Sequence, residues 1–138
     1  MIVLDTNVIS EFTRPMPDLR VQAWLRDQSP ADLATTTVTE AEIFAGLVVM
    51  PDGKRKTALI QETQTLLGAF GDRIFPFDRD AAQIYPLIVL QRKALGQAAG
   101  TADSQIAAIA RLHGAAVATR NTTHFTHSGI ELINPWTD

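Results

Sequence analysis

The chain alternates between short apolar runs and longer stretches in which apolar residues recur every three or four positions. The short runs predict strands at residues 2–4, 33–36, 73–77, 115–119 and 130–133. The first run is apolar throughout, which is typical of a central strand in a parallel sheet that is covered on both faces.

The longer stretches have the helical period. They predict helices at residues 19–27, 38–50, 54–70, 78–96 and 101–113, and an apolar stripe within residues 8–12 predicts a shorter one. Pro86 lies inside the fourth of these five stretches, so we expect a kink there. Strands separated by helices predict an α/β fold with a central, mainly parallel sheet flanked by helices.

The length and residue composition are typical of a single folded domain. The chain has 138 residues, of which 46% are hydrophobic and 20% charged, so we expect a single domain over residues 1–138. The absence of cysteine excludes disulfides, zinc–thiolate sites and thiol catalysis, and it suits the cytoplasm. The first apolar run ends at Asp5, too soon for a signal peptide or a membrane span, so we expect a cytoplasmic protein with no membrane partner.

The net charge of -3 argues against a protein that coats nucleic acid through a broad basic face. A local basic strip stays open as an alternative to ordinary solvated helix faces. Its candidates are Lys54, Arg55 and Lys56, then Arg92 with Lys93, and finally Arg14, Arg20 and Arg26.

Two polar residues follow predicted strands. Asp5 comes directly after the first strand and Asn121 shortly after the fourth. Ligands bind beyond the carboxyl ends of the strands in such sheets, where both residues would lie. Each also has an ordinary structural explanation, Asp5 as a helix N-cap and Asn121 as a turn residue.

Two helices supply further carboxylates. Asp103 stands in the first turn of its helix, where it suits the helix dipole, but it also shares the inward apolar face with Ile106 and Ala110. The segment TTVTEAEIFAGL holds two overlapping capping boxes, Thr37 with Glu40 and Thr39 with Glu42. If Thr37 is the cap, Glu42 is free to face the site, and Glu40 remains its competitor.

If Asp5, Glu42 and Asp103 meet, they need a counter-charge. Two carboxylates about 4 Å apart repel each other by roughly 4 kcal/mol at an effective dielectric constant near 20. A cluster of three must therefore take up a proton or a cation. Oxygen ligands favour a hard divalent ion, Mg²⁺ or Mn²⁺, which also suits phosphate substrates.

The motifs LDTNVISE, TVTEAEIFAG, TADSQIAAIA and VATRN, followed by NPW, stand in a characteristic order. With them the chain resembles the PIN-domain ribonucleases, specifically the VapC-like and FitB-like toxins of bacterial toxin–antitoxin pairs, from residue 1 to about residue 136. The resemblance implies a PIN-like fold and Mg²⁺-dependent cleavage of RNA. It also implies a homodimer, and a cognate antitoxin whose tail enters the site and whose DNA-binding domain carries the pair to operator DNA.

The resemblance carries the family's metal-binding acids onto Asp5, Glu42 and Asp103, and its fourth site position onto Asn121. Relatives commonly have an acid there or three residues on, where this chain has Asn121 and His124. One negative charge fewer should weaken binding of a second cation.

These residues lead to one main hypothesis for the site. Asp5 and Asp103 hold Mg²⁺, Glu42 ligates it through water or orients the attacking water, and Asn121 completes the site. Asn7 and Thr119 are expected to fix the carboxylates by hydrogen bonds. The alternatives are a weakly catalytic PIN-fold binding module that acts through an antitoxin–DNA complex, and a phosphoryl-transfer enzyme with Asp5 as nucleophile.

Overall fold

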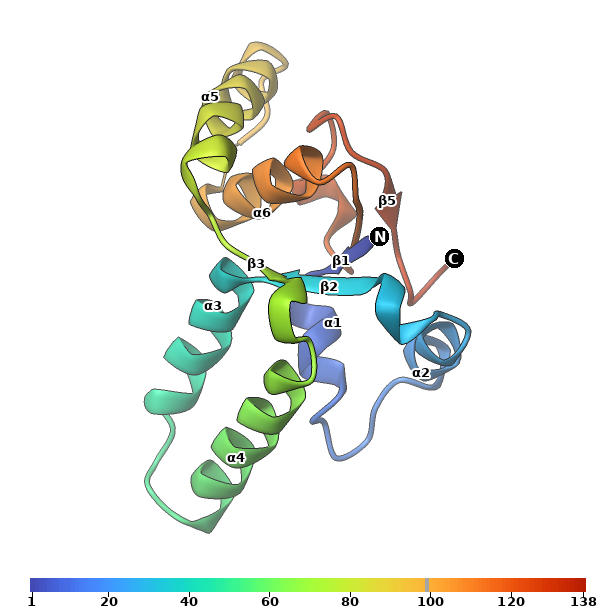
Figure 1. Ribbon diagram of the computed structural model, residues 1–138, viewed down its shortest axis with the longest axis vertical. Coiled ribbons are helices and arrows are strands. Elements are labelled where there is room, and N and C mark those ends of the chain that lie inside the picture. Colours follow the sequence, from blue (N-terminus) through green and yellow to red (C-terminus); the bar gives the residue numbers. More distant parts are fainter. Residues whose placement is uncertain (99) are drawn as a thin grey trace.

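A computed structural model describes residues 1–98 and 100–138, and within them five strands form one parallel sheet (Figure 1). The strands are β1 (Ile2–Leu4), β2 (Leu33–Thr36), β3 (Ile74–Phe75), β4 (Ala116–Ala118) and β5 (Leu132–Ile133). Their order across the sheet is β3-β2-β1-β4-β5, and each neighbouring pair is parallel. The predicted α/β fold with a parallel sheet is confirmed.

Helices cover both faces of the sheet. They are α1 (Thr6–Glu11), α2 (Leu19–Arg26), α3 (Thr37–Val48), α4 (Lys54–Gly68), α5 (Arg79–Ala94) and α6 (Thr101–Leu112). In Figure 1, α5 and α6 lie above the sheet, and α1, α3 and α4 lie below it. The predicted helices are all present, and α5 continues through Pro86.

Alternate residues of each strand enter two separate cores. Val3 and Val117 pack with α5 and α6, whereas Leu4 and Ala118 pack with the helices of the opposite face. This alternation follows from the two-residue period of a strand. It explains why β1 is apolar at every position.

Two local predictions are corrected. Neither predicted capping box begins α3, because the N-cap is Thr36, whose hydroxyl accepts a hydrogen bond from the Thr39 N–H at 3.1 Å. The third strand is only two residues long, instead of covering residues 73–77. Pro76 follows it directly and has no N–H to continue the ladder.

A search of the described residues for a helix that is long and apolar enough to span a membrane finds none.

Candidate active site

Asp5 occupies the carboxyl end of the central strand. Its N–H donates to the Ala118 carbonyl of β4 at 3.0 Å, so β1 and β4 end side by side. The side chain is the N-cap of α1, with Oδ1 accepting from the Thr6 N–H at 2.8 Å. Oδ2 accepts from the Thr119 hydroxyl at 2.7 Å, which is the contact predicted for Thr119. Asp5 is therefore both a cap and a buried carboxylate, with only 4% of its surface exposed.

The surroundings of Asp5 favour its neutral form. Burial, the largest effect, raises the pKa of its carboxyl group, and the negative charges of Asp103 and Glu42 raise it further. The hydrogen bonds from Thr119 and Thr6 act in the opposite direction without cancelling the rise. The fold thus brings the three predicted acids close enough for Asp103 and Glu42 to change the ionisation of Asp5.

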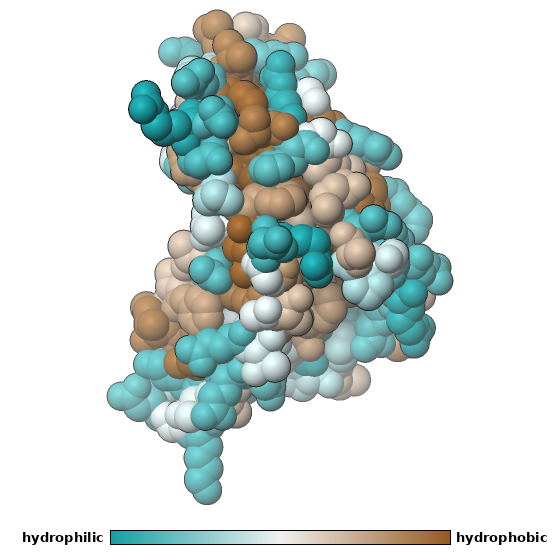
Figure 2. Space-filling model, viewed as in Figure 1, coloured by the Kyte–Doolittle hydropathy of each residue, from teal (hydrophilic) through white to brown (hydrophobic). Residues whose placement is uncertain are grey.

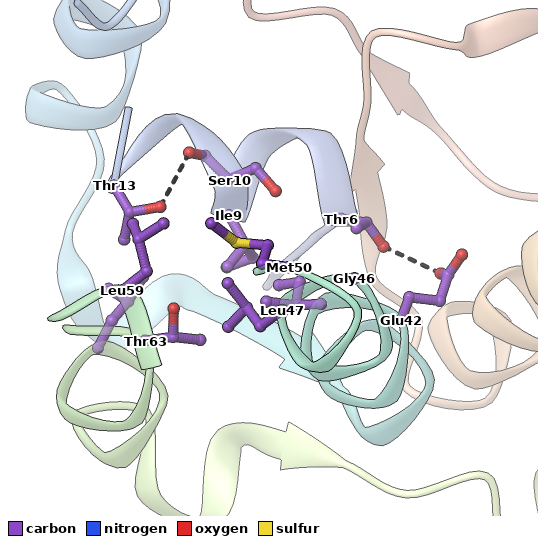
Figure 3. A pocket seen from close by; sticks show the side chains of 12 residues that line it. Thr6, Ile9, Ser10, Thr13, Glu42, Gly46, Leu47, Met50, Leu59 and Thr63 are labelled. Carbon is purple, nitrogen blue, oxygen red and sulfur yellow. Dashed lines mark hydrogen bonds between the residues drawn. The ribbon is translucent and has the colours of Figure 1, made fainter. Parts of the chain in front are cut away.

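Glu42 faces this site from the first half of α3. Its Oε1 accepts from the Thr6 hydroxyl at 3.0 Å, as the dashed line in Figure 3 shows. Thr6, the residue directly after Asp5, therefore connects the start of α1 to the carboxylate on α3. Glu40 is not among the groups that shift the pKa of Asp5, so the placement favours Glu42 of the two candidates.

Asp103 approaches from the N-terminal turn of α6. It is partly exposed, at 28%, and its Oδ2 lies 3.2 Å from Nδ1 of His124. Along α6 the residues that follow on the same side, Ile106 and Ala110, are fully buried. The inward direction predicted for the Asp103 face of the helix is therefore present.

Asn121 is linked to the site through its backbone. Its N–H donates to the Thr119 hydroxyl oxygen at 3.0 Å, and that hydroxyl donates to Asp5. The described contact of Asn7 differs in kind from the predicted donation to a carboxylate, because its Oδ1 accepts from the Arg120 N–H at 3.2 Å. Asn7 thus ties the segment after β4 to α1, and its described hydrogen bond goes to the backbone and not to a carboxylate.

The sequence did not predict the contacts that three residues of this region make: Thr6, His124 and Arg92. Thr6 and His124 contact acids through tertiary neighbours, which the sequence order does not reveal. Arg92 is not part of a basic strip, because it is 4% exposed and donates to backbone carbonyls of Ala98, Thr123 and Thr126. The sequence pattern gave no indication that Arg92, which precedes Lys93 on a predicted helix, would be buried.

The donor set suits a divalent cation. In the part of the chain that the structure describes, no Lys or Arg forms a salt bridge with Asp5, Glu42 or Asp103. Among the same residues, no three acidic or histidine side chains are already gathered tightly enough to enclose one ion. Mg²⁺ takes only one or two carboxylates directly and completes its shell with water, so the oxygen donors present fit it.

An apolar groove leads away from Glu42 between α1, α3 and α4 (Figure 3). Thr6 and Glu42 stand at one end of it, and Thr13 and Leu59 at the other. Its volume is about 300 Å³. The residues that line it are Thr6, Ile9, Ser10, Thr13, Glu42, Ile43, Gly46, Leu47, Met50, Leu59, Thr63 and Leu66.

The family model, the related sequences and the solved structures that match this chain all point to the same protein family. The sequence matches the PIN domain family over residues 2–128. It is 44% identical to VapC ribonuclease Y4jK of Sinorhizobium fredii, over 99% of this chain and 98% of that protein. It is 42% identical to Toxin FitB of Neisseria gonorrhoeae, over the full length of both. A solved structure of FitAB bound to the IR36 DNA fragment superposes with a TM-score of 0.95 at 41% identity, covering 100% of this chain and 97% of that one.

Proposed function

Because this chain belongs to the PIN-domain family, we propose that it is a metal-dependent endoribonuclease, the toxin of a bacterial toxin–antitoxin pair, that hydrolyses RNA phosphodiester bonds. We also infer that residues 1–138 form a single cytoplasmic domain. The names of the relatives, a VapC ribonuclease and Toxin FitB, support the activity and the role. The observation that carries the proposal is the buried carboxylate of Asp5, whose pKa is raised by burial and by two further acids.

Each acid has a role that follows from its position. Asp5 and Asp103 hold Mg²⁺, for which Mn²⁺ is a substitute, and Glu42 orients the attacking water. When bound, the cation polarises the scissile phosphate and lowers the pKa of that water. Thr119 and Thr6 hold the Asp5 and Glu42 carboxylates in place by donating their hydroxyl protons. The Asn121 amide, which has no charge to add, completes the site toward the substrate.

Replacing one metal-binding acid by its amide tests the proposal. Asp5→Asn and Asp103→Asn should each lower chelator-sensitive cleavage of a mixed RNA pool by about 100-fold or more, because a ligand charge is lost while the shape is kept. Asp80→Asn is the matched control, since Asp80 is an exposed acid in the first turn of α5. Gel analysis of the RNA with Mg²⁺ or Mn²⁺, and with chelator, gives the rates.

A second pair of variants separates the two glutamates. Glu42→Gln should slow cleavage strongly, and Glu40→Gln should not, although the two residues stand in the same helix and lose the same charge. Full activity of Asp5→Asn or Asp103→Asn would refute the assignment. No chelator-sensitive cleavage by the unaltered protein would favour the other candidate, a binding module whose site is weakened by Asn121.

The groove of Figure 3 supports a protein partner. We infer that the tail of a cognate antitoxin lies in it, with its apolar side chains on Leu47 and Leu59 and its end near Glu42. Operator DNA is bound only through the antitoxin, because the chain itself carries a net charge of -3. The FitAB structure bound to DNA supports this arrangement.

An exposed apolar strip on α5 supports a homodimer. Leu87 and Leu90 of α5, and Leu95 directly after its end, expose 54%, 67% and 55% of their surface. Figure 2 shows apolar side chains gathered at the end of the molecule where α5 lies. Such a strip on a protein surface typically marks an interface. On the same helix, Ile84 and Tyr85 pack against the core and are therefore not part of this strip.

A further inference from the structure

Arg120 directly follows the residue that donates to Asp5. The Thr119 hydroxyl donates to Asp5 Oδ2, and the Arg120 N–H donates to Oδ1 of Asn7 in the first turn of α1. The backbone of Arg120 is therefore fixed beside the carboxyl ends of β1 and β4. The reaction proposed above gives this arginine no role.

A buried tryptophan supports the Arg120 side chain. The guanidinium carbon lies 5.3 Å from the centre of the Trp136 ring, which is within the range of a cation–π contact. Trp136 is 4% exposed and packs in the core with Leu4 and Ala118. Its backbone N–H donates to Oδ1 of Asn134 at 3.0 Å. The guanidinium therefore rests on a ring that the fold holds in place.

Within residues 1–98 and 100–138, no acid forms a salt bridge with Arg120. The residue is exposed to solvent. A guanidinium presents its N–H donors in one plane, in a geometry that matches the oxygens of a phosphate, and contact with an aromatic face leaves those donors free. Because Trp136 already restricts the side chain, less conformational freedom is lost when a ligand binds.

Arg120 and Asp103 lie toward opposite faces of the sheet. Asp103 comes from α6, which packs on one face, whereas Trp136 packs with the residues of the other face. The guanidinium therefore flanks the acids at the edge of the sheet and does not join them. An RNA strand whose scissile phosphate lies among the acids continues past this edge, so a neighbouring phosphate is the group that Arg120 can reach.

We propose that Arg120 binds a backbone phosphate of the RNA next to the phosphate that is cleaved. The inference rests on the proposed function, because it assumes that RNA crosses the edge of the sheet at Asp5. A contact with phosphate positions the strand and adds affinity without reading the bases. It also supplies a local positive charge for a polyanion in a chain whose net charge is -3.

The test measures RNA binding separately from cleavage. A short fluorescent RNA of mixed sequence is titrated with Asp5→Asn protein in Mg²⁺ at several salt concentrations, and fluorescence anisotropy gives Kd. Adding Arg120→Gln should raise Kd about fivefold and reduce the slope of log Kd against log salt by about 0.7, the value for one phosphate of a single strand. Single-stranded DNA of the same sequence should show the same loss, because a phosphate contact does not need the 2′-hydroxyl.

Arg111→Gln is the matched control. Arg111 is an exposed arginine in the last turn of α6, at the opposite end of that helix from Asp103. It removes the same charge and should change Kd by less than about twofold, with the salt slope unchanged. Arg120→Lys keeps the charge and should keep the salt slope of the parent protein. Arg120→Gln should unfold within about 4 °C of the parent protein, because the side chain that it replaces is exposed.

Three results would overturn the inference. Equal Kd and salt slope with and without Arg120→Gln would show that Arg120 does not contact RNA, and an equal effect of Arg111→Gln would show that only net charge matters. A loss seen with RNA and not with DNA would show that the contact is not to phosphate. In each case, cleavage by the unaltered protein still supports the proposed function. If the protein neither binds nor cleaves RNA, the proposed function fails together with the inference.

Discussion

At the scale of single residues, Asp5 carries two functions that compete. As an N-cap it stabilises α1 through the Thr6 N–H, and as a buried carboxylate it suffers desolvation and the repulsion of Asp103 and Glu42. Its raised pKa means that folding favours the protonated form. The stability that this form adds is fully present below the ordinary pKa of 3.8 and is lost as the pH rises through the raised value.

We therefore predict that Asp5→Asn makes the metal-free protein more stable at neutral pH. An amide fills the same space, accepts from the Thr6 N–H through Oδ1 as before, donates through Nδ2 to the Thr119 hydroxyl oxygen in place of accepting from it, and carries no charge. The gain in unfolding free energy over the parent protein should grow as the pH rises from near 3.8 to neutral. Denaturant unfolding in chelator at several pH values measures it. A variant that is less stable than the parent across this range would contradict this account of the Asp5 environment.

Sequence reasoning identified those site residues that follow strands or face inward on helices. Asp5 and Asn121 were predicted to lie at the sheet edge because parallel strands end there, and Asp103 was predicted to face inward because its helix has a clear apolar face. The choice between Glu40 and Glu42 could not be made, because the start of α3 depends on Thr36 and not on either predicted capping box. The contacts of Asn7 and His124 arise from tertiary packing, so no spacing in the sequence predicts them.

At the scale of elements, the structure depends on one buried arginine in α5. The guanidinium of Arg92 donates to carbonyls in two segments on either side of α6, at Ala98 before it and at Thr123 and Thr126 after it. This is why an apparently basic helix face includes a residue that is 4% exposed. It joins α5 to both ends of the region that carries Asp103 and His124.

Replacing this arginine should be costly. Arg92→Met removes the hydrogen bonds that the buried guanidinium donates to the carbonyls of Ala98, Thr123 and Thr126, and we expect a loss of about 3 kcal/mol in unfolding free energy. Lys93→Met is the control, because Lys93 is the exposed neighbour on the same helix and should change stability by less than about 0.5 kcal/mol. Thermal and denaturant unfolding measure both variants. Equal effects of the two substitutions would show that the Arg92 contacts add nothing.

The helices and most strand positions were predictable because each has its own local pattern. The apolar period marks α3 to α6, and the uninterrupted apolar run marks β1. The length of β3 was not predictable from its apolar pattern, because Pro76 ends the ladder after two residues. Thr36 and Pro76 therefore account for the start of α3 and the end of β3, whereas β5 is also shorter than predicted, covering Leu132–Ile133 of residues 130–133.

At the scale of the whole molecule, the sheet order assembles the site. β1 lies between β2 and β4, and the three parallel strands end at the same edge of the sheet. The segments that leave this edge are α1 after β1, α3 after β2, and the loop after β4. Asp5, Glu42 and Asp103 are far apart along the chain and approach one another at this edge. Asp103 reaches it from the first turn of α6. The parallel fold could be predicted from alternating strands and helices, but the strand order and the exact distances between acids could not.

The central claim is that one divalent cation binds among these three carboxylates. Anomalous diffraction from a crystal of the protein soaked in Mn²⁺ tests it most directly. We predict an anomalous peak between Asp5 and Asp103, on the side that faces Glu42, and its absence from a soaked Asp5→Asn crystal. A strong peak elsewhere with none at Asp5, or an unchanged peak in the variant, would contradict the account.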